Sequence, residues 1–156
     1  MSSRRKAREV VLKAIYLAES REMDIEDALN EMASVDNEMI VIGEEPENME
    51  IKPFSLGLDA EEKEFALALT KKIENNKNKL NEQIIPVLKN WELSRIPRID
   101  RIIMWIAISE FLFSSDIPAQ VSIDEAIEIA KKYSSEKSAA FINGVLDSVR
   151  KNLKLT

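Results

Sequence analysis

The order of apolar and polar positions along the chain predicts helices almost throughout. Over 3–20, apolar residues recur three and four positions apart, which places them on one buried stripe of a helix. The same period indicates helices at 24–33, from 59 to about 88, at 97–113, at 121–133 and at 135–153. Pro86 is expected to kink or break the long one, because it removes a backbone donor. We therefore expect an all-α bundle of about seven helices, with strand-like alternation confined to 39–42 and 51–56.

Two of these helices begin with the signature of a capping box. Asp59 stands three residues before Glu62, and Ser122 stands three residues before Glu125. In such a box each side chain bonds the backbone N–H of the other residue and so satisfies two donors at the helix start. The helices are therefore predicted to start beside Asp59 and at Ser122.

Between the second and third helices lies a long connection, 34–58, with mixed apolar residues and a block of acids. We expect a short helix or an extended piece at 38–42 within it. The chain is interpreted as one domain over 1–156, with an N-terminal helical part at about 1–58 and a C-terminal part at about 59–156. The helix at 97–113 is apolar nearly all round from Ile102 onward, which predicts a central helix wrapped by the others.

The amino-acid composition excludes several classes of catalytic and metal-binding sites. The 156 residues include no Cys and no His, which excludes disulfides, thiolate catalysis, imidazole bases and Cys/His zinc sites. No glycine-rich phosphate loop is present, and the carboxylates are spread along helix surfaces. We expect no enzyme, no cofactor and no metal. No apolar stretch is long enough for a membrane span and no secretory signal is visible, so a cytoplasmic protein is expected.

Charge is distributed unevenly. The net charge is −6, yet residues 1–16 carry five cations against Glu9 alone, a net of +4. Cations in the first turns of a helix are unfavourable, because that end already carries partial positive charge. Several cations on one face are typical of phosphate binding, and a merely solvated basic start to the helix is the alternative. At 100° per residue, Arg5, Leu12 and Tyr16 are expected on the surface beyond the buried stripe, with Arg4 and Arg8 at its edge.

The last helix carries a second candidate face. Lys137, Phe141 and Gly144 are spaced i, i+4 and i+7, so a cation, an aromatic ring and a glycine fall on one line. They indicate a site for a nucleotide or a partner chain. Phe141 as an ordinary residue at the edge of the core, and Gly144 as a small-residue packing contact, are the alternatives. Asp100 is interpreted as pairing with Arg98 and Arg101.

Three segments together resemble the NusB family of bacterial transcription antitermination factors. "RRKAREVVLKAIY" (4–16) is similar to its arginine-rich opening helix, and "WELSRIPRIDRIIMWIAISEF" (91–111) to its central motif. "VSIDEAIEIAKKYSSEKSAAFINGVLDSV" (121–149) resembles its signature of a capping helix followed by F-[VI]-N-G-V-L-D. Ser134-Ser135 departs from this pattern, since a Gly is common there. The resemblance implies two packed helical subdomains and no catalysis.

The resemblance also implies partners. Proteins of this kind bind boxA, a single-stranded motif of ribosomal RNA transcripts, together with the small-subunit ribosomal protein NusE, and help RNA polymerase read through terminators. The implied RNA-binding residues are Arg4, Arg5, Lys6, Arg8, Tyr16, Lys137, Phe141 and Asn143. The NusE surface is expected on the C-terminal subdomain, and a homodimer is left open. The alternatives are a helical protein-interaction module, or the NusB-like domain of a ribosomal RNA cytosine methyltransferase.

Overall fold

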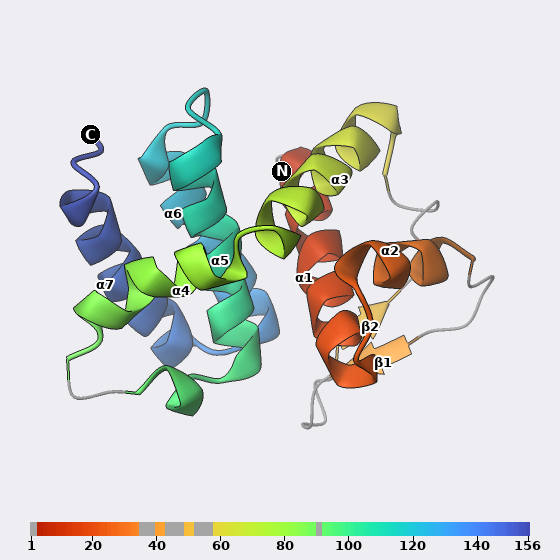
Figure 1. Cartoon of the computed structure of the whole chain (residues 1–156), viewed down its shortest axis with the longest axis horizontal. Coiled ribbons are helices and arrows are strands. Elements are labelled where there is room, and N and C mark those ends of the chain that lie inside the picture. Colours follow the sequence, from red (N-terminus) through yellow and green to blue (C-terminus); the bar gives the residue numbers. More distant parts are fainter. Residues whose placement is uncertain (1–2, 35–39, 43–48, 52–57, 90–91) are drawn as a thin grey trace. The chain divides into compact units, whose positions relative to one another are not determined.

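The helices of the chain fall into two compact units. The computed structural model describes residues 3–34, 40–42, 49–51, 58–89 and 92–156. Unit 1 is Met1–Glu74 and unit 2 is Asn75–Thr156. Within the described residues there are seven α-helices and one short pair of strands (Figure 1). The expectation of an all-α protein of about seven helices is thus confirmed.

Helix α1 (Ser3–Arg21) is the centre of unit 1, because both α2 (Ile25–Ser34) and α3 (Ala60–Glu74) pack against it (Figure 1). Most of the predicted stripe of α1 is buried. Leu12, expected on the surface, is also fully buried, and so is Leu17 nearby. That expectation was wrong because a helix covered by two neighbours buries more than one stripe. The residues of unit 1 that are almost wholly buried include Ala7, Val11, Leu12, Ala14, Ile15, Ile25, Ala28, Ala66 and Ile73.

Two short antiparallel strands, β1 (Ile40–Ile42) and β2 (Met49–Ile51), follow α2. Ile40 lies opposite Ile51, and Ile42 lies opposite Met49. The extended piece expected at 38–42 is confirmed over 40–42, and its pairing with β2 is a feature that the sequence pattern did not predict. The remainder of the expected connection lies outside the described residues.

Helix α3 begins with the predicted capping box. The Glu62 backbone N donates to Asp59 Oδ1 at 2.8 Å, and the Asp59 backbone N donates to Glu62 Oε1 at 3.1 Å. The buried residues Ala66, Leu69 and Ile73 follow at helical spacing. Because α3 packs against α1 and α2, it belongs to unit 1. This grouping differs from the expected division after residue 58, which placed α3 with the C-terminal part.

The long helical pattern breaks at the predicted point, Pro86, and also earlier, between Glu74 and Lys77. Helix α4 (Lys77–Ile84) starts after Asn76, whose carbonyl accepts from the Leu80 backbone N at 2.9 Å. A 3₁₀ turn at Ile85–Val87 contains Pro86, and a second one covers Leu93–Arg95. Pro86 has no N–H to continue the α-helical ladder, so the chain changes to a tighter turn there.

Helix α5 (Arg98–Phe113) is the core of unit 2, as predicted. It is packed by α4, by α6 (Ala119–Tyr133) and by α7 (Glu136–Asn152), and every residue from Ile102 to Phe111 is buried. The Trp105 Nε1 donates to Asn81 Oδ1 at 2.8 Å and so joins α5 to α4. No helix in the described ranges has both the length and the apolar character needed to cross a bilayer.

The predicted capping box at Ser122 is wrong. Helix α6 begins at Ala119 after Pro118, so Ser122 lies inside its first turns. Its hydroxyl donates to Glu110 Oε1 at 2.7 Å, and the residue is 2 % exposed, so this buried bond joins α6 to α5. Val121, the residue before Ser122, is 43 % exposed. Ser122 therefore belongs to a buried contact between helices rather than to a cap, and the helix begins directly after Pro118.

The Ser134-Ser135 pair forms the junction between α6 and α7. The Ser134 hydroxyl donates to Asp100 Oδ1 at 2.8 Å, and Asp100 is 2 % exposed. Ser135 Oγ accepts from the Ser138 backbone N at 3.0 Å and caps α7. Asp100 therefore anchors this junction to the start of α5, and its pairing with Arg98 and Arg101 stays a prediction. Ser134 is thus the residue at which α6 ends, and Ser135 is the N-cap of α7.

We expect Ser122→Asp to destabilise the protein by about 3 kcal/mol or more, because it buries a second carboxylate beside Glu110. Asp is an equally good N-cap residue, so a capping role at this position would tolerate it. The matched control is Val121→Asp, which adds the same charge at the exposed neighbour and should change stability by about 0.5 kcal/mol. Urea denaturation followed by circular dichroism measures both. Equal stabilities of the two variants would contradict the assignment of Ser122 to a buried contact.

Candidate nucleic-acid interface

The cations at the start of α1 meet an aromatic ring of α3. The guanidinium carbon of Arg4 lies 4.9 Å from the centroid of the Phe65 ring, and that of Arg8 lies 5.3 Å from it. Arg4 is exposed, Phe65 is half-buried, and Arg8 is only 2 % exposed. Two guanidinium groups one helical turn apart are thus held by one ring.

This contact explains how α1 tolerates its basic start. Arg4 and Arg8 are four residues apart, a spacing at which like charges repel. The positive end of the helix dipole adds to that cost. The face of the Phe65 ring carries negative partial charge and attracts both groups, each contact contributing roughly 0.5–2 kcal/mol depending on its exposure. The unfavourable placement is therefore offset locally within unit 1.

An open hollow of about 260 Å³ adjoins the Arg4 side chain. The Phe65 ring and Ala68 form its apolar part, and the glutamates in the first turns of α3 form its polar part. The lining residues are Arg4, Glu61, Glu62, Glu64, Phe65 and Ala68. Although these carboxylates are near, Arg4 makes no ion pair with any described residue. Its N–H donors therefore remain available to an anion from outside.

A second group of α1 residues lies on another side of the helix. At 100° per residue, Arg5, Lys6, Lys13 and Tyr16 fall within roughly a third of the circumference, away from Arg4 and Arg8. We call these four residues the open strip. Lys6 is exposed and pairs with no carboxylate among the described residues, and the other three are half-buried. The strip places three cations and an aromatic side chain along about 16 Å of helix, an arrangement suited to a chain of phosphates and bases.

The predicted RNA-binding residues of α1 therefore divide by environment. Arg4 and Lys6 are exposed, whereas Arg5 and Tyr16 are half-buried. Arg8 is buried beneath the surface and packs on Phe65, so its contact with RNA stays a prediction. Lys13, one of the five cations in residues 1–16, is a further member of the open strip that was not predicted as an RNA-binding residue. Phe65 was missed, because nothing in the sequence indicates that the aromatic residue of α3 meets the arginines of α1.

The candidates of α7 belong to unit 2 and are described separately. Lys137 and Asn143 are exposed, and Phe141 is half-buried. Phe141 lies roughly 40° around the helix from Lys137, whereas Asn143 lies roughly 160° from Phe141. Lys137, Phe141 and Gly144 thus share one side, and Asn143 does not lie on their line. Gly144 is exposed, and a Cβ there would meet no heavy atom of the described residues within 4 Å. The packing alternative for Gly144 is wrong.

The aspartate of the same segment has an intrahelical role. Asp147 forms ion pairs with Arg150 and with Lys151, whose Nζ lies 3.1 Å from Asp147 Oδ2. The hydrogen bond from Lys151, assisted by Arg150, lowers the pKa of Asp147 below its ordinary value. These pairs therefore persist until the pH falls below the usual range of an aspartate. Among the described residues, no group of three acidic side chains is placed to hold a metal ion.

Comparison with known proteins shows the family to which the chain belongs. The model of the NusB family matches residues 5–151. A transcription antitermination protein NusB from Clostridium botulinum (strain Kyoto / Type A2) is 38% identical over 145 residues, which are 92% of this chain and 96% of the relative. The chain belongs to the NusB family.

Solved structures of NusB proteins share the fold. NusB from T. maritima superimposes with a TM-score of 0.76 at 34% identity, covering 97% of this chain and 92% of the other. A structure of antitermination factors NusB and NusE in complex with double-stranded RNA matches with a TM-score of 0.71 at 18% identity, covering 97% and 98%. At that identity it establishes the fold alone. As a NusB protein, the chain is a non-catalytic transcription antitermination factor, which confirms the expectation drawn from the residues.

We expect Arg8→Ala to destabilise this NusB protein by about 1–3 kcal/mol, because it removes a buried side chain and its contact with Phe65. Lys6→Ala, on the same helix, should change stability by no more than about 0.5 kcal/mol, since Lys6 is exposed. Thermal denaturation followed by circular dichroism compares the two variants. A melting temperature of Arg8→Ala equal to that of wild type would show that Arg8 does not stabilise unit 1.

Proposed function

We propose that the chain binds the single-stranded boxA-type RNA of ribosomal RNA transcripts together with NusE, and that the complex supports read-through by RNA polymerase. The observation that carries this proposal is the open strip on α1, together with the exposed Arg4 on another side of the same helix. It concentrates cations and a tyrosine on one helix of a chain whose net charge is −6. The proposal places the protein in the cytoplasm, where transcription takes place.

Electrostatics favours a polyanion as the ligand of this helix. Cations that neutralise phosphates release condensed counterions, and this gain is lost as salt rises. Arg4 and Lys6 have no ion pair among the described residues, so binding RNA would not require them to break one. A phosphate near the start of α1 would also be attracted by the positive end of the helix dipole.

The α7 residues provide a second proposed contact. Lys137 supplies a cation, Phe141 a partly accessible ring, and Asn143 an amide that reads donors and acceptors. The open surface at Gly144 lets a backbone approach α7 closely. Because Asn143 lies on another side of α7, the proposal assigns it a contact distinct from that of Lys137 and Phe141.

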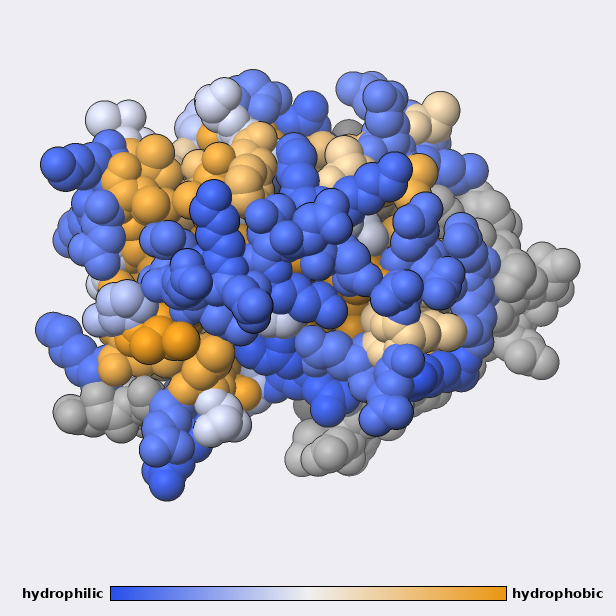
Figure 2. Space-filling model, in the orientation of Figure 1, coloured by the Kyte–Doolittle hydropathy of each residue, from blue (hydrophilic) through white to orange (hydrophobic). Residues whose placement is uncertain are grey.

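Unit 2 is also the proposed site for NusE. In the view of Figure 2, hydrophilic side chains cover most of the described surface, and hydrophobic patches interrupt it over the helices of unit 2. Two large apolar side chains of this unit are exposed: Ile85 at 55 % in the 3₁₀ turn, and Val121 at 43 % on α6. Exposed apolar residues are suited to a protein partner rather than to phosphates. The structure of a NusB with NusE and RNA supports a joint complex of this kind.

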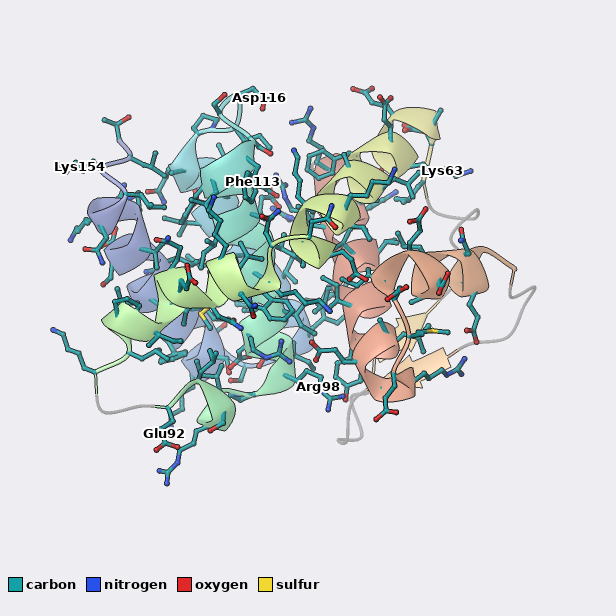
Figure 3. The ribbon with its side chains drawn as sticks, in the orientation of Figure 1. Lys63, Glu92, Arg98, Phe113, Asp116 and Lys154 are labelled. Carbon is teal, nitrogen blue, oxygen red and sulfur yellow. The ribbon has the colours of Figure 1, made fainter. Side chains whose placement is uncertain are left out.

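We expect Arg4→Gln/Lys6→Gln to weaken binding of labelled boxA-type RNA, measured by fluorescence anisotropy, by about tenfold or more at low salt. The slope of log K against log salt should shrink by about 0.7 for each phosphate of the single strand that the variant no longer neutralises. Lys154→Gln is the matched control. Lys154 lies beyond the end of α7 (Figure 3) and makes no ion pair with a described residue. It should leave affinity and slope unchanged.

The RNA controls separate the proposal from its rivals. A scrambled single strand and a duplex of the same sequence are titrated alongside, each with and without NusE. Selective binding to the boxA strand that tightens with NusE supports the proposal. Equal, weak binding to all three RNAs, unchanged by NusE, would contradict it and favour a protein-interaction module whose basic helix takes an acidic partner.

A further inference from the structure

We propose that Phe65 is a positioning residue for RNA binding, which holds the Arg4 guanidinium in a state ready to receive a phosphate. This inference rests on the proposed function and adds to it a residue of α3, outside the opening helix. It is carried by the two guanidinium groups that share the Phe65 ring, at 4.9 Å and 5.3 Å.

The first step concerns the freedom of the Arg4 side chain. An exposed arginine at a helix end populates many rotamers, and binding an anion removes that freedom. Contact with the ring restricts Arg4 before the ligand arrives. Arg8 is buried against the same ring and so fixes the ring from inside the unit. Arg8 therefore contributes to RNA binding through Phe65 rather than as a surface contact.

The second step concerns competition from carboxylates. Glu61 and Glu64 line the hollow beside Arg4, and both are exposed. A guanidinium released from the ring would come within reach of these carboxylates, and an ion pair with either would compete with RNA. In the structure Arg4 makes no ion pair with a described residue. The ring thus keeps the cation available, because its face attracts the guanidinium without occupying its hydrogen-bond donors.

The third step excludes a simpler role for the ring. A base-stacking platform needs an accessible face, whereas Phe65 is half-buried and already contacts two guanidinium groups. We therefore assign its effect to Arg4. Removal of the ring is therefore expected to weaken binding only when Arg4 is present.

A double-mutant cycle on the full chain tests the assignment, with anisotropy of boxA-type RNA as the readout. Phe65→Leu should weaken binding by about three- to tenfold in the wild-type background, the effect of removing a cation–π interaction of this kind. In the Arg4→Gln background the same change should cost less than about twofold, because the group that Phe65 positions is gone. Phe65→Tyr keeps an aromatic face and should retain wild-type affinity.

The matched control is Phe113→Leu. Phe113, at the end of α5 (Figure 3), is also half-buried and holds a cation, with Lys79 Nζ 5.6 Å from its ring centroid. The Phe113→Leu variant should bind RNA with wild-type affinity. Its melting temperature measures how much the loss of a half-buried ring of this kind lowers stability. Phe65→Leu should still unfold in one cooperative transition.

The outcomes distinguish the two proposals. Equal reductions in affinity from Phe65→Leu with and without Arg4 would overturn the positioning role and indicate direct stacking or a structural effect. A reduction in affinity in Phe65→Tyr as large as in Phe65→Leu would overturn it as well. Failure of the wild-type protein to select boxA-type RNA would instead overturn the proposed function itself.

Discussion

The packing of α2 and α3 against α1 is the interaction on which the proposed interface depends. It buries Leu12, Ile15 and Ala7 almost completely, and in doing so it fixes which sides of α1 remain open. The same packing brings Phe65 of α3 to Arg4 and Arg8. Without α3, Arg4 and Arg8 would lose the ring contact that offsets their mutual repulsion and the unfavourable helix dipole. The fold therefore both stabilises the cations and decides which of them face outward.

Unit 2 depends on a comparable constraint, the burial of α5 by its neighbours. A helix surrounded by others must satisfy any polar group that it buries. Glu110 accepts from Ser122 of α6, Asp100 accepts from Ser134 at the junction of α6 and α7, and Trp105 donates to Asn81 of α4. These polar contacts fix the order and register of the helices around α5, so α7 presents a defined open face.

Helical periodicity was sufficient to predict the elements, because each helix has a buried face that repeats in the sequence. The capping box of Asp59 and Glu62 was predictable because both partners are local. Contacts between helices could not be predicted in this way. Ser122 was predicted as a cap because its actual partner, Glu110, is on another helix. Leu12 was predicted to be exposed because the sequence of α1 does not show that two helices pack against it. In the candidate nucleic-acid interface, the cations of α1 were predictable from the local charge of the sequence. Phe65 was not, since its role exists only once α3 meets α1.

The central claim is that α1 is the RNA-binding element of this NusB protein and that Phe65 of α3 supports it. Chemical-shift mapping by NMR tests this most directly, with the isotopically labelled chain titrated with boxA-type RNA and with the scrambled strand. The account predicts that the boxA strand selectively shifts signals of residues 4–16 and of Phe65, including the side-chain signal of Arg4. Shifts that leave α1 and Phe65 unchanged while RNA binds elsewhere on the chain would contradict it.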